Sequence, residues 1–583
     1  DQPPPTAQFM ANPACFISAP PSMTNRDLAR NFKETYALIE LTGGNGFRAR
    51  ALAKAGRTLG RLETPAVDLL ARGDLATLPG VGKGVVAQVQ ELAETGTLQL
   101  YEDLRAAIPP GLLDVLQIKG LGAKRVRMLW QELGITSLDA LEAAAQTGRL
   151  EDVSGFGAKT QATVLEQIDL VRRYMEQWHY AQALPPTEAF LETLQAHPTV
   201  YRAALSGALR RQCETIETAD FLAAGPEAVA LAEALSLTVA DAPLPEATEA
   251  VLTGTLPNGL PLQVYLTTEA HWGTAWWATT SAEAHRTAWN EAYGTPPLTA
   301  EEPAFFATQD LPVIPPCLRE GRGELAAAAA GTLPTLITVE DLQGSLHNHS
   351  TYSDGANALA DMAERTRAMG LHYFGICDHS QSLKVAHGLS VAEVRKQQAE
   401  IERLNAQYEM DNLDFRVFSG IESDILPDGS LDYPDDVLAS FDFIVASVHV
   451  GLSMTEEVAT ERVLAAVRNP YTTILGHPTG RLLLRREGYP LDYERVLDAC
   501  AEHRVAVELN AHPLRLDLDW RWIRAATDRG VLISINPDAH TLDGLDDVRW
   551  GVAAAQKGWL TPDQCLNAFS LDAFTAWLQA RRP

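Results

Sequence analysis

The sequence predicts a chain of several domains: helical at the front, mixed α/β in the middle, and a mostly parallel sheet or barrel at the C-terminal end. Three observations predict this order. The length of 583 residues is more than one domain usually contains. A Gly-x-Gly pattern occurs three times before residue 160, each time followed by a helical pattern. From about Leu336, short apolar strands alternate with amphipathic helices.

The composition is that of a globular protein in a reducing compartment. Hydrophobic residues make up 46% of the chain, and no apolar run approaches the roughly 20 residues that span a bilayer. The six cysteines lie far apart without a Cys-x-x-Cys motif, which argues against both a disulfide framework and a cysteine-ligated zinc ion. The N-terminal sequence has neither a signal-peptide nor a transit-peptide pattern. We therefore expect a cytoplasmic monomer with no membrane partner.

The N-terminal region begins with a segment poorly suited to folding and continues as helices. Residues 1–23 are rich in proline and polar groups, so we expect a disordered tail. Leu28, Phe32 and Tyr36 then recur at helical spacing. Residues 47–57 predict a helix with a basic face. The net charge of −28 argues against a uniformly basic surface but leaves room for such local patches.

The three Gly-x-Gly segments, residues 78–83, 118–124 and 153–159, share one pattern. Glycines permit a tight turn and a close approach to another molecule, and the following helix start offers free N–H groups that suit a phosphate. The alternative is a helical repeat scaffold with ordinary turns. The segments resemble helix-hairpin-helix motifs, which hold the DNA backbone without reading its sequence. The resemblance implies DNA contacts by Gly80, Gly82, Lys83, Gly120, Gly122, Lys124, Gly155, Gly157 and Lys159.

Residues 206–222 contain a glycine, an Arg-Arg pair, a Glu-Thr pair and an apolar strand. They resemble the nucleotidyltransferase signature of family X DNA polymerases, in which helix-hairpin-helix domains also come first. The resemblance continues through Trp272-Gly and residues 279–281. It implies that Arg210 and Arg211 bind DNA or a nucleoside triphosphate. The alternative is an α/β domain with an unrelated pair of arginines.

The metal-binding carboxylates of that signature are mostly missing here. Two metal ions that align an in-line attack need three carboxylates. Thr218 and Gln263 stand at two of these positions, and only Asp220 remains as a catalytic remnant. Ala208 replaces the serine that would hold the triphosphate, and Thr280 replaces the glycine of the following turn. The sequence therefore predicts a polymerase site that is weak or dead.

Two other activities of the front half depend on single residues. A surviving polymerase would need manganese or magnesium held by Asp220 with Glu214 or Glu217 in a shifted arrangement. The lyase of related repair polymerases uses a lysine on the helix after the first hairpin, and Gln88 stands at that position. Lys83 lies elsewhere on the same helix, so we expect no lyase of this type. A short helix is predicted in the alanine run that ends at Gly331.

Seven strand candidates follow, and six of them end in His, Asp or Glu. The candidates end at or span 346–349, 373–377, 415–421, 443–448, 473–476, 505–510 and 531–535. The carboxyl ends of parallel strands meet at one mouth, so ligands far apart in sequence converge there. One histidine at a strand end is more often structural, but six such ends indicate a metal site. The candidate ligands are His347, His349, Asp354, His379, Glu422, His449, His477, Asp538 and His540.

This pattern resembles the PHP (polymerase and histidinol phosphatase) family, whose fold is a distorted (β/α)7 barrel with three metal ions. The resemblance implies one ion at His347, His349, Glu422 and Asp538. Glu422 would also bridge to a second ion, held by His449 and His477. The third ion would lie at Asp354, His379 and His540.

Zinc or manganese suits such histidine-rich sites better than magnesium. Glu422, His449 and Asp538 would be catalytic, and the reaction would be hydrolysis of a phosphodiester or phosphomonoester. Lys384, Arg485 and Arg515 follow strands and could hold phosphate, although surface ion pairs are an equal alternative. Asp517 could instead orient Arg515.

Together the resemblances imply a bacterial family X DNA polymerase that is active in DNA repair. Its PHP barrel would be a 3′-5′ exonuclease, and it could also cleave at abasic sites. The alternatives are an active manganese-dependent polymerase, a non-catalytic DNA-binding scaffold and a small-molecule phosphatase. The expected parts are a tail (1–23), a helix-hairpin-helix domain (24–103), a fingers-like domain (104–180), a palm (181–267), a thumb (268–320), a linker (321–336) and the PHP barrel (337–583).

Overall fold

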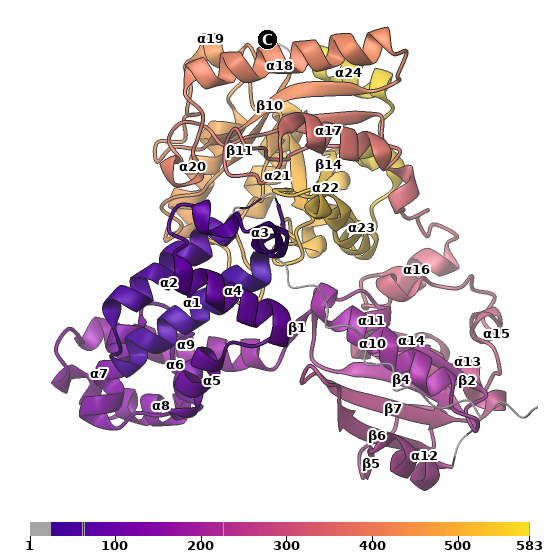
Figure 1. Cartoon of the computed structure of the whole chain (residues 1–583). Helices are drawn as coiled ribbons and strands as arrows, with labels where there is room; N and C mark the ends of the chain where they lie inside the picture. The colour runs from indigo at the N-terminus through magenta and orange to yellow at the C-terminus, as the bar shows by residue number, and fades with distance from the viewer. Residues whose placement is uncertain (1–24, 61, 63, 226, 582–583) are drawn as a thin grey trace, which may run out of the picture. The chain divides into compact units, whose positions relative to one another are not determined.

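The computed structural model describes residues 25–60, 62, 64–225 and 227–581 (Figure 1). The expected disordered tail, residues 1–23, lies outside the described residues. The chain forms two compact units that divide between residues 169 and 170, ahead of the expected boundary at residue 180. Among the described residues, no helix has the length and apolar character needed to cross a membrane. The five cysteines in the described residues are all free thiols.

The first unit is helical, as expected. Its helices are α1 (Asn25–Thr42), α2 (Gly46–Leu59), α3 (Ala66–Arg72), α4 (Lys83–Thr95), α5 (Gln99–Ala106), α6 (Leu112–Val115), α7 (Ala123–Leu133), α8 (Leu138–Gln146) and α9 (Ala158–Met175), the last of which continues into the second unit. The first glycine of each hairpin has a left-handed φ: +85° at Gly80, +88° at Gly120 and +87° at Gly155. Because side chains rarely tolerate this conformation, the three turns require glycine. α4, α7 and α9 begin directly after the second glycine of each copy.

The second unit begins with a five-stranded mixed sheet in the order β2-β4-β7-β6-β5, called the palm sheet below. Its strands are β2 (Arg202–Leu205), β4 (Ala219–Ala224), β5 (Thr238–Ala240), β6 (Ala250–Thr255) and β7 (Pro261–Thr267). Only β4 and β7 are parallel neighbours. The helices around it are α10 (Tyr180–Gln195), α11 (Gly207–Arg210) and α12 (Ala228–Leu235), and a short pair joins β1 (Trp178–His179) to β3 (Thr215–Ile216).

Helices with an aromatic core follow the palm sheet. They are α13 (Trp272–Thr280), α14 (Glu283–Tyr293), α15 (Glu302–Ala307) and α16 (Glu324–Ala329). Phe305 stacks on Trp277 and on Trp289, with ring centroids 4.5 and 4.4 Å apart, and the two tryptophan rings lie tilted with centroids 5.3 Å apart. The helix predicted in the alanine run is confirmed as α16. The expected linker is packed, since Glu324 Oε1 lies 2.5 Å from Nδ1 of the buried His285 on α14.

The C-terminal domain is the predicted barrel of seven parallel strands, and helices surround the sheet (Figure 1). The strands are β8 (Gly344–Ser345), β9 (Tyr373–Ile376), β10 (Arg416–Asp424), β11 (Phe443–Ser447), β12 (Ile474–Leu475), β13 (Ala506–Asn510) and β14 (Ile533–Asn536). The longer helices are α17 (Leu359–Ala368), α18 (Val391–Met410), α20 (Glu456–Val467), α21 (Tyr493–His503), α23 (Val548–Lys557) and α24 (Leu571–Gln579), and the short ones are α19 (Asp435–Leu438) and α22 (Ile523–Thr527).

The barrel closes through the loops beyond its first and last strands. A parallel bridge pairs Asn348 with Ala539, and the His349 main-chain N–H donates to the Ala539 carbonyl over 2.8 Å. This closure brings together two loops that carry predicted metal ligands. Two strand ends differ from the expected ones: β8 stops at Ser345, before His347 and His349, and β10 runs on to Asp424, so that Glu422 lies inside the strand near its end.

Candidate metal centre

All nine predicted ligands gather at one end of the barrel. His347, His349 and Asp354 follow β8, His379 follows β9, Glu422 lies near the end of β10, His449 follows β11, His477 follows β12, and Asp538 and His540 follow β14. The parallel order of the strands explains the convergence, because every strand delivers its carboxyl end to the same mouth.

The Glu422 carboxylate is the middle of this cluster and is only 1% exposed. Its Oε1 lies 2.9 Å from His477 Nε2, 3.1 Å from His449 Nε2 and 3.3 Å from His347 Nε2. Its Oε2 lies 2.8 Å from His379 Nδ1. Four imidazoles around one carboxylate form a geometry in which a bridging ligand can serve more than one metal ion.

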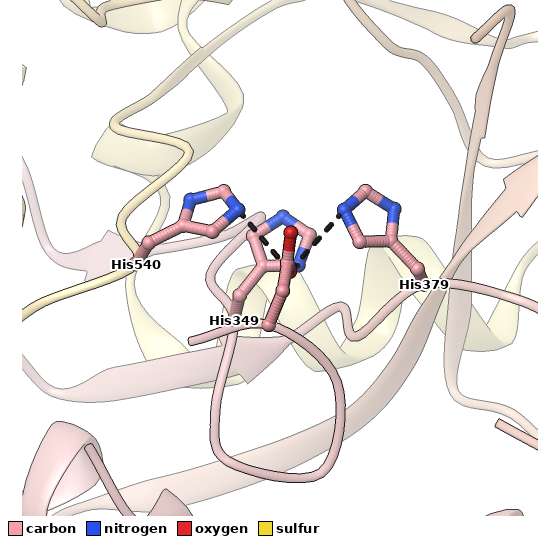
Figure 2. A group of neighbouring side chains, drawn as sticks. His349, His379 and His540 are labelled. Atoms are coloured by element: carbon pink, nitrogen blue, oxygen red, sulfur yellow. Dashed lines mark ion pairs between the residues drawn. The ribbon is translucent and has the colours of Figure 1, made fainter. Parts of the chain in front are cut away.

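A second group surrounds Asp354, whose Oδ1 lies 3.4 Å from His540 Nε2, 3.5 Å from His379 Nε2 and 3.9 Å from His349 Nδ1. Figure 2 shows the His540 and His379 rings on either side of His349. The ring centroids lie 4.1 Å apart for His349 and His540, and 4.5 Å apart for His349 and His379. This group matches the expected third set and adds His349 to it.

Asp538 joins the two groups. Its Oδ1 lies 3.1 Å from His349 Nε2 and 3.7 Å from His347 Nε2, while Asn510 Nδ2 donates to Oδ2 over 3.0 Å. His347 and Asp538 both have left-handed backbones, with φ of +58° and +52°. Such conformations cost on the order of 1 to 3 kcal/mol each and are found at functional sites that need a particular side-chain direction.

The buried atoms of the cluster fit divalent metal ions. His347 Nε2, His349 Nδ1 and Glu422 Oε2 are buried and form no hydrogen bond, although Glu422 Oε2 lies 2.8 Å from His379 Nδ1. Unpaired polar atoms in a protein interior are costly, and a coordinated cation would satisfy all three. Imidazole and carboxylate are ligands that suit zinc and manganese. The donor set is therefore suited to divalent metal binding.

The protonation of the cluster is governed by opposite charges at close range. Burial by itself raises the pKa of Glu422, but His449, His347 and His379 lower it well below its usual range. Burial lowers the pKa of His449, but Glu422 and then Asp424 raise it to about 10. Metal ions bind the unprotonated nitrogen, so ions that enter this site would displace protons.

Sequence reasoning missed two carboxylates behind the ligands. Asp424 Oδ1 lies 2.7 Å from His449 Nδ1, and Glu508 Oε1 lies 2.5 Å from His347 Nδ1. A signal existed for each. Glu508 is a single acidic residue inside the apolar strand 505–510, and Asp424 follows Glu422 at the two-residue period of a strand.

The predicted phosphate-binding residues have different surroundings. Lys384 and Arg485 are exposed in the loops after β9 and β12. Arg515 lies against the site, with Nε 3.6 Å from Asp538 Oδ2. The expectation that Asp517 orients Arg515 was wrong, because the Asp517 carboxylate accepts hydrogen bonds from the main-chain N–H and hydroxyl of Thr479, both over 3.0 Å.

Asp220 has no carboxylate beside it in the register of the palm sheet. It pairs with Gln263 across β4 and β7, and Gln263 Oε1 accepts from the Tyr265 hydroxyl over 2.6 Å. Burial raises the pKa of Asp220 to about 7, although Arg211 lowers it in part. Gly207 has φ +57°, and a Cβ there would lie 1.9 Å from Asp220 Oδ2, so this turn requires glycine.

The two arginines of the signature have internal partners. Arg210 forms a bidentate ion pair with Glu302, at 2.8 and 2.7 Å, and Arg319 Nη1 reaches the same carboxylate over 2.7 Å. Arg211 Nε pairs with Glu320 over 2.9 Å. Binding of a triphosphate by either arginine would have to compete with these carboxylates.

The carboxylates of the shifted-metal alternative are also engaged. Glu214 accepts from Trp520 Nε1 over 2.9 Å and pairs with Arg521 Nη1 over 2.8 Å. Glu217 Oε1 accepts from Gln177 Nε2 over 3.0 Å. A metal ion shared with Asp220 would require Glu214 to leave an ion pair.

The hairpin lysines lie at the first or second position of their helices and are exposed. Lys83 begins α4, Lys124 is second in α7 and Lys159 is second in α9. Lys124 is 85% exposed, with Nζ 3.8 Å from Glu40 Oε2. These positions place positive charge beside the free N–H groups of a helix start.

Three family models match the chain, and their order follows the fold. A helix-hairpin-helix domain matches residues 23–98, and a SAM-like helix-hairpin-helix tandem matches residues 112–169. A PHP domain matches residues 345–512. The matches cover the three Gly-x-Gly hairpins and the first part of the barrel.

Known proteins resemble the chain at two scales. The DNA polymerase/3′-5′ exonuclease PolX of Bacillus subtilis (strain 168) is 33% identical over 582 residues, which cover 96% of this chain and 100% of that protein. A probable phosphatase of Acetivibrio thermocellus is 30% identical over 178 residues, 28% of this chain and 64% of that protein. One from Thermoanaerobacter sp. (strain X514) is 24% identical over 233 residues, 38% of this chain and 88% of that protein.

Proposed function

Because the chain belongs to the DNA polymerase/3′-5′ exonuclease PolX family, we propose that it is a DNA-repair enzyme whose working catalytic centre is a metal-dependent 3′-5′ exonuclease in the PHP barrel. The observation that carries the proposal is the convergence of nine imidazole and carboxylate ligands, with Glu422 and Asp354 each at the middle of a group. Cleavage at abasic sites is a second reaction of the same kind, because it breaks the same phosphodiester backbone.

The residues divide into those that hold metal and those that hold substrate. One ion would be held by His347, His349, Glu422 and Asp538. A second would be held by Glu422, His449 and His477, and a third by Asp354, His379 and His540. When bound, zinc or manganese would lower the pKa of a coordinated water and neutralise phosphate oxygens. Arg515, 3.6 Å from Asp538, lies where its guanidinium could hold a non-bridging phosphate oxygen.

The front half supports DNA as the substrate. Three helix-hairpin-helix turns present exposed lysines beside helix starts, and such turns contact the phosphate backbone without reading bases. We propose that Lys83, Lys124 and Lys159 hold DNA in this way. The boundaries proposed from the sequence would divide the DNA-holding part into two domains at residue 103 and separate it at residue 180 from the palm (181–267), the thumb (268–320), the linker (321–336) and the barrel (337–583).

The palm is proposed to polymerise weakly or not at all. Three observations support this: Gln263 beside Asp220, the raised pKa of Asp220, and the ion pairs that engage Arg210 and Arg211. Two-metal catalysis needs several anionic ligands, and a carboxyl whose pKa burial raises to about 7 is harder to ionise than an ordinary aspartate.

A paired assay tests both halves. Digestion of a 3′-labelled primer should proceed with wild type and with Asp220→Ala and fail with His347→Ala, whose metal content should also fall. Extension of a template-primer with manganese should be weak with wild type and should not depend on Asp220. Strong extension that Asp220→Ala abolishes would show that the palm is a polymerase, whereas digestion by a metal-free His347→Ala would refute the barrel assignment.

A phosphatase is the second candidate, because relatives that match 28% and 38% of the chain are named probable phosphatases. It predicts turnover of a small phosphomonoester without release of nucleotides from DNA. The exonuclease predicts release of nucleotides from DNA in preference to turnover of the phosphomonoester. The same wild-type and His347→Ala proteins, given both substrates, separate the two.

A further inference from the structure

Glu508 lies on β13, the one barrel strand that supplies none of the nine proposed ligands. Its side chain is fully buried. A buried carboxylate is costly unless it is paired or hydrogen-bonded, so its partners indicate what it does. Those partners are two metal-ligand residues and one asparagine.

The Glu508 carboxylate accepts from three N–H donors. His347 Nδ1 lies 2.5 Å from Oε1, the His477 main-chain nitrogen lies 2.5 Å from Oε2, and Asn536 Nδ2 lies 2.9 Å from Oε1. An ionised carboxylate is purely an acceptor, so it fits this arrangement of donors.

The contact with His347 decides which ring nitrogen faces the ligand cluster. Acceptance by Glu508 keeps the proton on Nδ1, so the lone pair is on Nε2, 3.3 Å from Glu422 Oε1. The other Glu508 oxygen holds the main chain of His477, whose Nε2 lies 2.9 Å from the same Glu422 oxygen. One carboxylate therefore fixes residues that belong to two different ligand sets.

We propose that Glu508 is a positioning residue that supports two of the three proposed metal sites at once, through the ring of His347 and the main chain of His477. The inference rests on the proposed metal-dependent function. Asp424 would position a single ligand, because its Oδ1 lies 2.7 Å from Nδ1 of the His449 ring. Carboxylates that accept from a ligand histidine typically change metal affinity 10- to 100-fold when they are removed.

Glu508→Gln is the test. Glutamine offers one acceptor oxygen and one NH₂ group, so at least one of the three donors would face another donor. In Glu508→Gln, we expect the affinity for two of the ions to fall about 10- to 100-fold. In Asp424→Asn, we expect the affinity for one ion to fall by a similar factor and the affinity for the others to stay unchanged. The measurements are Mn²⁺ titration of the metal-free full-length chain by calorimetry and metal counting after dialysis.

Two further readouts separate positioning from general stability. The absorption spectrum of the Co²⁺-loaded protein reports ligand geometry, and it should change in Glu508→Gln but not in Asp546→Asn. Asp546 is the matched control, since its carboxylate pairs with Arg365 at 3.0 Å on the barrel surface. Glu508→Asp keeps the charge, so it should bind metal more tightly than Glu508→Gln; if Glu508→Gln fails to fold, weakened binding by Glu508→Asp relative to wild type supports the proposal.

The outcomes are distinguishable. Wild-type affinity and an unchanged cobalt spectrum in Glu508→Gln would overturn the positioning role while leaving the proposed function intact; wild-type affinity in Glu508→Asp would do so if Glu508→Gln does not fold. A wild-type chain that takes up no metal would overturn both. Equal loss for Glu508→Gln and Asp424→Asn, one ion each, would refute the claim that Glu508 supports two sites.

Discussion

At the scale of single residues, the palm sheet contains a carboxyl group that is costly to ionise. Burial raises the pKa of Asp220 to about 7, well above the value near 3.9 expected in the unfolded chain. The folded state therefore binds this proton more tightly. The contribution of this group to the free energy of unfolding is fully present below about pH 4 and is lost as the pH rises toward about 7.

Asp220→Asn should remove this pH dependence. In metal-free protein, we expect the free energy of unfolding of the variant to equal that of wild type near pH 4. At pH 8 it should exceed the wild-type value by about 2 kcal/mol, allowing for solvent screening of a partly exposed group. Urea unfolding at several pH values measures the difference. A constant offset across that range would contradict the raised pKa.

The carboxylate of Glu302 is a second costly group, and here two arginines offset the cost. Burial raises its pKa, but Arg210 and Arg319 bring it down to about 2. Their side chains are 13% and 0% exposed. Glu302→Gln should therefore destabilise the second unit by about 3 to 5 kcal/mol, because it leaves buried guanidinium groups without a counter-charge.

The neighbouring residue supplies the control for that experiment. Glu301 pairs with Arg202 over 2.9 Å, but the two side chains are 59% and 38% exposed. Glu301→Gln should cost at most about 1 kcal/mol. Urea unfolding of both variants makes the comparison, and equal losses would mean that the buried pair is no stronger than the exposed one.

At the scale of elements, the helix-hairpin-helix turns should act as independent phosphate contacts. Lys124→Ala and Lys159→Ala should each make the slope of log affinity against log salt less negative by roughly one. The effect should be the same for every DNA sequence. Fluorescence anisotropy with duplex DNA at several salt concentrations measures the slope. Arg72→Ala, at the exposed end of α3 and outside the hairpins, should leave it unchanged.

The barrel elements explain why ligands so far apart in sequence meet. Each strand is short, from two residues in β8 and β12 to nine in β10, and each ends at the same mouth. The strand patterns were readable in the sequence because buried parallel strands are continuous apolar runs. The end of β10 could not be read from the sequence in this way, because Glu422 and Asp424 are charged residues within the strand and polarity alone predicts a loop there.

At the scale of the whole molecule, the two compact units should respond differently to metal removal. Ligands that bind only the folded state stabilise it, by about 3 to 4 kcal/mol at 100 to 1,000 times the dissociation constant. A chelator should therefore lower the unfolding temperature of the unit from residue 170 onward and leave that of the helical unit unchanged. Calorimetry with and without chelator, followed by added Mn²⁺, tests this; equal shifts in both transitions would contradict it.

The sequence by itself determined the hairpin turns, the barrel and the nine candidate ligands. These features are local: a Gly-x-Gly turn, an apolar strand or a histidine at a strand end is visible within ten residues. Tertiary structure alone decided that Glu508 accepts from His347, that Arg210 is paired with Glu302, and that Asp517 holds Thr479 rather than Arg515. The reason is physical: a carboxylate takes whichever donors the fold brings to it, and most of these donors lie 31 to 161 residues away in sequence.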